Sequence, residues 1–319
     1  MSIASALKTR LPGGVMFNNL YKFSLSKISK DNPLEVALFT KKKLVLQNFF
    51  LGCEEERHLE YYKYLYKTLC DLFTDTSNKD FFDFKGAKVP KAISDKDLIT
   101  FAQEAVDLLT FDLLDNNTLC EAASTEGPYE RGKVRVSAGD VVIDCGANMG
   151  VFSAVASNKG GTIYAFEPSD YIIKNYLSKT AEFNKNIHIC KYALSDKREE
   201  LNFEFNDKDI GAGRLSIVKN EQSGVQPQSV QAISLDEFVE ENKVCKVDFI
   251  KADIEGAERF LLKGAKQTLK EFAPKLSICT YHLPDDPKIL REIILAANPN
   301  YIIEEKFQKL YAHVPQKTA

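Results

Sequence analysis

The sequence has no cysteines at the spacing that a disulfide framework or a zinc site requires. Its seven cysteines are an odd number, and none belongs to a C-x-x-C pair. Several of them, Cys145, Cys190 and Cys279, lie inside apolar stretches, where a small buried thiol is the expected role. This cysteine usage is typical of a reducing compartment, so we expect a cytoplasmic protein.

Long apolar runs and an excess of one charge are also missing. No run of about eighteen apolar residues could span a membrane, and residues 1–11 lack the apolar centre of a secretory signal. The 45 acidic residues nearly balance the 42 lysines and arginines, so no overall positive field attracts nucleic acid. We therefore expect no membrane span and no nucleic-acid partner.

Two common phosphate-binding signatures are absent from the stretch Val141–Ser153, VVIDCGANMGVFS. Apolar residues lead into Asp144, a turn bracketed by Gly146 and Gly150 follows, and a helical pattern begins near Val151. The glycine pair of a dinucleotide-binding turn and the lysine of a P-loop are both missing. An acid at this turn would repel a pyrophosphate. It suits a cofactor with a cationic amino-acid end, such as S-adenosylmethionine, which has no phosphate.

The character of the chain changes near residue 120. Helical periodicity marks residues 34–73 and 94–114, and a polar stretch at 74–95 predicts a connector. After residue 120, short apolar runs alternate with helical ones, which predicts βαβ units and a parallel sheet. We therefore expect a mainly helical N-terminal region (1–119) and an α/β domain (120–319). The N-terminal region could recognise the acceptor, form a homodimer or buttress the sheet, and the sequence favours none of these.

The α/β domain is expected to contain ten strands, separated by helices and loops. The expected strands are 133–136, 141–145, 162–166, 187–192, 201–205, 230–235, 247–252, 275–281, 301–305 and 309–313. The expected helices are 151–157, 168–183, 236–241, 256–272 and a last one that ends near residue 297. Residues 206–227 are rich in polar residues and glycine and predict a loop.

Ionisable residues follow several of the predicted strands. They are Asp144, Glu167, Asp253, Glu255 and His282. Ligands of an open α/β sheet bind beyond the carboxyl ends of the strands, so these side chains are expected to converge. Glu167 ends the strand after the glycine turn, where a carboxylate can accept hydrogen bonds from two ribose hydroxyls.

An ordered set of motifs resembles the FkbM family of S-adenosylmethionine-dependent methyltransferases. The motifs are Asp144–Gly150 (DCGANMG), Phe166–Pro168 (FEP), Ala193–Asp196 (ALSD) and Ile250–Glu258 (IKADIEGAE). Gly127–Glu130 (GPYE) and Tyr281-His282 also resemble members of that family. The resemblance covers about residues 120–315, whereas residues 1–119 carry no recognisable motif.

The resemblance implies a class I methyltransferase fold. This is a Rossmann-like, mostly parallel sheet of seven strands, with helices on both faces and the last strand antiparallel. It also implies a cofactor site. In that site, the methionine portion of the cofactor would lie against the turn residues Gly146, Ala147, Asn148 and Gly150, with its ammonium near Asp144. The ribose would contact Glu167 and Pro168, and the adenine would contact Ser195 and Asp196. Asp253 would lie near the transferring methyl group.

Methyl transfer to a hydroxyl requires a group that removes the proton. His282 is favoured as this base because its ordinary pKa lies near neutrality. Asp253 could orient His282 or serve instead, and Glu255 completes the catalytic set. These residues with Glu258 could alternatively bind Mg²⁺. The dipole at a helix start already explains an acid at position 258, so we expect no metal site.

The sequence therefore predicts a methyltransferase, with O-methylation favoured. The expected acceptor is a small molecule or glycan, through a hydroxyl of a sugar or another natural product. A nucleotide-dependent oxidoreductase is an alternative that the GANMG spacing opposes. A catalytically inactive cofactor-binding or assembly module is another. Tyr129 and Arg214 are weaker candidates for covering the site, because a solvated loop explains both.

Overall fold

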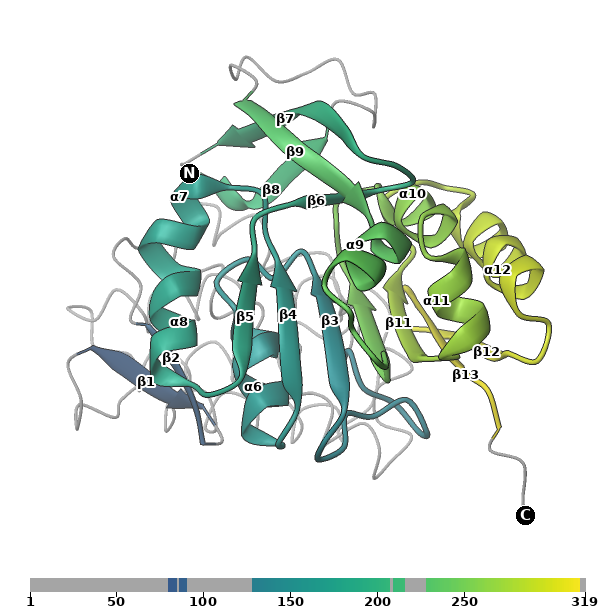
Figure 1. The fold of residues 1–319 in the computed structure, drawn as a ribbon, viewed down its shortest axis with the longest axis horizontal. Helices are drawn as coiled ribbons and strands as arrows, with labels where there is room; N and C mark the ends of the chain where they lie inside the picture. Colours follow the sequence, from purple (N-terminus) through teal and green to yellow (C-terminus); the bar gives the residue numbers. More distant parts are fainter. Residues whose placement is uncertain (1–79, 85, 91–127, 207–208, 216–227, 316–319) are drawn as a thin grey trace, which may run out of the picture. The chain divides into compact units, whose positions relative to one another are not determined.

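The computed structural model describes residues 80–84, 86–90, 128–206, 209–215 and 228–315 (Figure 1). All of them belong to one compact unit, which comprises residues 77–91 and 126–319. The helices expected at 34–73 and 94–114 lie outside the described residues, so the N-terminal region and its boundary at residue 119 stay predictions. None of the helices in the described ranges is long and apolar enough to cross a membrane.

A seven-stranded sheet forms the centre of this unit, in the order β12-β13-β11-β10-β3-β4-β5. The strands are β3 (Val141–Cys145), β4 (Thr162–Phe166), β5 (Ile187–Cys190), β10 (Phe249–Ala252), β11 (Lys275–Cys279), β12 (Ile302–Lys306) and β13 (Lys309–His313). All neighbours pair in parallel except at β13, which is antiparallel to both β11 and β12. The class I methyltransferase fold and its antiparallel last strand are thereby confirmed.

Helices cover both faces of this sheet. They are α6 (Val151–Asn158), α7 (Asp170–Ile172), the π-helical turn η2 (Ile173–Leu177), α8 (Ser178–Phe183), α9 (Leu235–Glu241), α10 (Glu258–Lys263), α11 (Lys266–Glu271) and α12 (Asp286–Ala297). Ile143 of β3 packs in one cluster with Phe238 of α9 and Leu261 of α10. On the other face, Phe249 of β10 meets Phe152 of α6 at 5.9 Å between ring centroids. The central strands are apolar on both sides because both sides are buried.

A second sheet, which the sequence did not predict, has the strand order β6-β9-β7-β8. Its strands are β6 (Ala193–Ser195), β7 (Glu199–Asn206), β8 (Asp209–Leu215) and β9 (Gln228–Ser234). The loop expected at 206–227 is therefore wrong where β8 pairs with β7. The residues of β8, DIGAGRL, are poor in strand formers, and pairing with a neighbour decides their structure. The strand expected at 133–136 is only an isolated bridge between Arg131 and Val134.

A hairpin lies inside the stretch that was expected to be a connector. Strands β1 (Phe81–Phe84) and β2 (Ala87–Pro90) pair antiparallel. The backbone amide of Lys88 donates to the side-chain oxygen of Asn184, just after α8, at 2.9 Å. The connector prediction is therefore wrong for residues 81–90, which pack on the α/β fold.

The second sheet packs against the segment that follows β10, on which several predicted site residues lie. Ile254 and Ala257 share an apolar cluster with Ala193, Leu201, Phe203, Val230 and Ala232. Gly264, between α10 and α11, lets the chain approach β6 closely. A Cβ atom at Gly264 would lie 2.2 Å from the carbonyl oxygen of Ser195. The single helix expected at 256–272 is consequently divided in two at this glycine.

We predict that Gly264→Ala destabilises this unit by more than about 2 kcal/mol, because the added methyl group must displace backbone. Urea unfolding followed by circular dichroism measures the change. Gly132→Ala is the matched control. The added methyl group would lie in open space, but Gly132 has a positive φ. The substitution should therefore lower the free energy of unfolding by about 1 kcal/mol through backbone strain alone. Equal effects of both variants would contradict a close contact at Gly264.

Candidate active site

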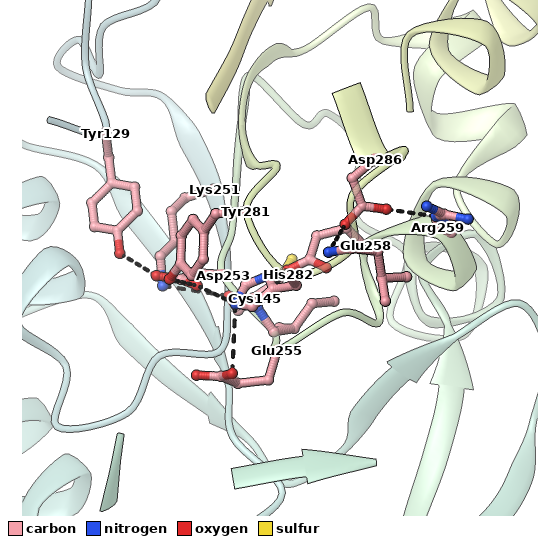
Figure 2. A network of polar contacts seen from close by, with 12 residues as sticks. Tyr129, Cys145, Lys251, Asp253, Glu255, Glu258, Arg259, Tyr281, His282 and Asp286 are labelled. Atoms are coloured by element: carbon pink, nitrogen blue, oxygen red, sulfur yellow. Dashed lines mark hydrogen bonds and ion pairs between the residues drawn. The ribbon is translucent and has the colours of Figure 1, made fainter. Parts of the chain in front are cut away.

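Asp253, directly after β10, lies at the centre of a polar network (Figure 2). Its Oδ2 accepts a hydrogen bond from the Tyr129 hydroxyl at 2.6 Å, and its Oδ1 accepts one from the Tyr281 hydroxyl at 2.9 Å. Burial raises the pKa of Asp253, but the charges of Lys251, His282 and Lys309 outweigh burial and set the pKa below its ordinary value. Asp253 is therefore a carboxylate at neutral pH.

Tyr129 is a buried part of this network rather than a solvated loop residue, so that expectation is corrected. Burial and the neighbouring Asp253 raise the pKa of its phenol well above the ordinary value, so Tyr129 stays a hydrogen-bond donor. The GPYE motif was the feature of the sequence that could have indicated a site role for Tyr129. Arg214 falls in β8, where the side chains lie outside the described part of the chain.

His282, which follows β11, lies among three carboxylates. Its Nδ1 is 3.1 Å from Oε1 of Glu258, and its Nε2 is 3.6 Å from both Asp253 Oδ1 and Glu255 Oε2. Burial lowers the pKa of His282, but these carboxylates prevail and raise it to about 9. The structure thus brings Asp253, Glu255 and His282 together. The raised pKa is unfavourable for the base that the sequence favoured, because a protonated imidazole cannot accept a proton.

Lys251 is a site residue that sequence reasoning missed. It is the partner of Asp144 in the register of β10 and β3, and both side chains are almost fully buried. Its ammonium lies 3.2 Å from Asp144 Oδ1 and donates to the carbonyl oxygen of Gly146 at 2.7 Å. Ser153 donates to Asp144 Oδ2 at 2.6 Å. The Asp144 carboxylate therefore faces protein groups, and its positive partner is Lys251.

The glycine turn after β3 has an alternating left-handed backbone. The φ angles of Gly146, Asn148 and Gly150 are +75°, +49° and +83°, values that favour glycine and that asparagine tolerates. A Cβ atom at Gly146 would lie 2.1 Å from the carbonyl oxygen of Asp253. Gly146 of this turn, next to the buried Ala147, is thus in direct backbone contact with Asp253 at the centre of the polar network.

Glu167, at the end of β4, is joined to the same turn. Its Oε2 accepts from the backbone amide of Asn148 at 3.2 Å, and its Oε1 accepts from that of Ser169, beyond Pro168, at 2.8 Å. Burial raises the pKa of Glu167 to about 7, against the effect of these two donors. The carboxylate is therefore poised between its charged and neutral forms at neutral pH.

Ser195 and Asp196 have different surroundings. The Ser195 hydroxyl donates to Glu199 at 3.3 Å, and its backbone packs against Gly264. Asp196 is exposed and lines a surface cavity of about 540 Å³ with Lys263, Lys266 and residues of α12. The contacts of Ser195 and Asp196 are therefore separate from the polar network around Asp253 and from the turn at Gly146.

Comparison with known proteins identifies the family of this chain. The family model described as the methyltransferase FkbM domain matches residues 144–312, more than half of the chain. The hexuronic acid methyltransferase AglP of Haloferax volcanii is 28% identical over 158 residues. That alignment covers 50% of this chain and 62% of the relative, so less than two thirds of the relative's length is spanned.

Among solved structures, the methyltransferase FkbM of Methylobacillus flagellatus KT is similar to this chain. The two are 22% identical, with a TM-score of 0.41. The alignment covers 66% of this chain and 54% of the other.

We predict that Lys251→Met destabilises the protein by about 3–5 kcal/mol, because it leaves the buried Asp144 carboxylate without a cation. Adding Asp144→Asn to this variant should recover part of the loss, since no buried charge then remains unpaired. Denaturant unfolding measures both variants. Lys288→Met removes an exposed ammonium beside Glu292 on α12 and should cost less than about 0.5 kcal/mol. A loss in Lys251→Met as small as this control would contradict the buried ion pair.

Proposed function

Because this chain belongs to the FkbM methyltransferase family, we propose that it transfers the methyl group of S-adenosylmethionine to a hydroxyl of a sugar, a glycan or another natural product. The observation that carries the proposal is the backbone contact between the turn at Gly146 and Asp253. A cofactor seated on this turn would have its reactive end beside an ionised carboxylate.

The proposed cofactor seat consists of the turn and Glu167. Gly146, Ala147, Asn148 and Gly150 offer backbone to the methionine portion, and Glu167 offers carboxylate oxygens to the ribose hydroxyls. Asp144 would act indirectly, because its carboxylate holds Lys251, which in turn binds the Gly146 carbonyl. Ser195 and Asp196 remain the proposed contacts of the adenine; without cofactor, the Ser195 hydroxyl donates to Glu199 and both residues lie against the Gly264 turn.

We assign the proton acceptor to Asp253 rather than His282. When bound, S-adenosylmethionine supplies a methyl group on a sulfonium, and the C–S bond breaks as the acceptor oxygen bonds to the carbon. The hydroxyl proton moves to Asp253, which is ionised at neutral pH. Tyr129 and His282 hold this carboxylate in place, and the alignment of acceptor oxygen and methyl group contributes much of the rate.

A sugar acceptor is supported by two observations. The relative from Haloferax volcanii carries the name of a hexuronic acid methyltransferase. Tyr281, whose hydroxyl donates to Asp253, is 37% exposed, so its ring presents a surface to an incoming molecule beside the carboxylate. The 28% identity of the relative leaves the individual sugar open to experiment.

We predict that S-adenosylmethionine binds more tightly as the pH rises through about 7. Ribose hydroxyls favour the ionised form of Glu167, whose pKa is about 7 in the free protein. The dissociation constant should therefore fall up to about tenfold between about pH 6 and about pH 8. Isothermal titration calorimetry measures it.

Glu167→Gln is the matched variant, because it keeps the shape of the side chain and cannot ionise. The dissociation constant is measured against pH for wild type and for Glu167→Gln. The difference between the two curves is the contribution of Glu167, because any titration of the cofactor itself affects both proteins equally. The same slope in both proteins would refute the ribose role, and no binding by wild type would refute the cofactor.

We predict that Asp253→Asn lowers kcat by at least about a hundredfold, because the amide cannot accept the proton. S-adenosylmethionine affinity should change far less. The assay measures release of S-adenosylhomocysteine with hexuronic acids, neutral glycosides and phenolic natural products as acceptors, and NMR of the product locates the methyl group.

Asp170→Asn is the control for this variant, because Asp170 is an exposed carboxylate paired with Lys191. It should leave kcat unchanged. Cofactor binding by wild type without transfer to any acceptor would instead support an inactive module, and an unchanged kcat in Asp253→Asn would remove Asp253 as the proton acceptor.

A further inference from the structure

Glu258, the first residue of α10, is fully buried, and one of its carboxylate oxygens has no hydrogen-bond donor. Its Oε1 accepts from the backbone amide of Ile254 at 2.9 Å and lies 3.1 Å from His282 Nδ1. Its Oε2 is buried and has no hydrogen-bond donor. A buried carboxylate oxygen without a donor is costly. The helix dipole does not remove this cost, because α10 has only six residues and the dipole supplies no donor to Oε2.

His282 has the same property. Its side chain is 6% exposed, and its Nδ1 meets only Oε1 of Glu258, at 3.1 Å and without the geometry of a hydrogen bond. Its Nε2 is 3.6 Å from the nearest carboxylate oxygens of Asp253 and Glu255, which is longer than a hydrogen bond. Unpaired nitrogens and oxygens that are buried together indicate a missing partner that can bind both.

The three side chains of Asp253, Glu258 and His282 each offer one ligand atom, and these atoms lie within 4.8 Å of one another. They come from three places in the chain, namely the loop after β10, the start of α10 and the loop after β11 (Figure 2). Metal–ligand bonds of about 2.0–2.3 Å allow two ligands of one ion to lie roughly 4 Å apart. Small side-chain movements would therefore bring all three atoms onto one ion.

We propose that Asp253, Glu258 and His282 bind one divalent cation in the protein without cofactor and acceptor, the state in which Asp253 has not yet received the acceptor proton. The two carboxylates would balance its charge, and their oxygens with an imidazole nitrogen form a donor set that suits Mn²⁺ or Zn²⁺ better than Mg²⁺, which prefers oxygen alone. The sequence favoured no metal because a helix start explains Glu258. The orphaned Oε2 is the observation that changes this interpretation.

The alternative partner for these atoms is a proton on His282, which would pair with the surrounding carboxylates and leave no room for a metal ion. A bound cation and a protonated His282 lead to different predictions for the binding of Mn²⁺. The cation site predicts stoichiometric binding that depends on His282 and Glu258. The protonated histidine predicts that folded protein binds no Mn²⁺ at this position.

The experiment adds Mn²⁺ to the full chain after removal of metals with a chelator, in the absence of cofactor and acceptor. Calorimetry should show one ion per chain. Glu258→Gln and His282→Gln should each weaken binding by at least about tenfold, whereas Glu240→Gln, an exposed carboxylate on α9, should leave it unchanged. Circular dichroism establishes that each variant is folded.

Pulsed electron paramagnetic resonance of the wild type gives a readout that needs no variant. Mn²⁺ held by His282 should show a ¹⁴N coupling from the imidazole. Absence of binding at millimolar Mn²⁺ and Zn²⁺, absence of the nitrogen coupling, or equal affinity in all three variants would each overturn the proposal. Because neither cofactor nor acceptor is present, such a failure would leave the proposed methyl transfer intact.

Discussion

The buried ammonium of Lys251 is the interaction on which the geometry of the site depends. It lies in β10, two residues before Asp253, and it reaches across to β3, where it pairs with Asp144 and binds the carbonyl oxygen of Gly146. One strand therefore fixes both the glycine turn and the carboxylate that faces it. The acid that first suggested a seat for a cationic cofactor acts through this lysine, because it is fully buried, pairs with the Lys251 ammonium and accepts a hydrogen bond from Ser153.

The second sheet supports the site from the other side. Its apolar residues pack against Ile254 and Ala257, which flank Glu255 in the segment after β10. Glu255 itself has a φ of +55°, a conformation that non-glycine residues adopt only when their surroundings impose it. The class I sheet thus supplies the strand ends, and the added sheet packs against the loop that carries Asp253 and Glu255.

Local features were predictable from the sequence, and features that depend on distant partners were not. Strands β3 and β4 were predicted to the residue, because buried parallel strands are continuous apolar runs that end in motifs. Strand β8 was missed because its composition resembles a loop until β7 pairs with it. Tyr129 was undervalued because Asp253, its partner, is 124 positions away. The raised pKa of His282 follows from three carboxylates whose convergence no spacing reveals.

We propose that the turn at Gly146, Glu167 and Asp253 together hold a methyl donor. The most direct measurement is a crystal structure with S-adenosylhomocysteine bound. We expect ribose hydroxyls within hydrogen-bond distance of Glu167, the amino-acid portion against the turn, and the sulfur facing Asp253. The nucleoside bound away from Glu167, for example in the surface cavity beside Asp196, or a sulfur that faces away from Asp253 would contradict it.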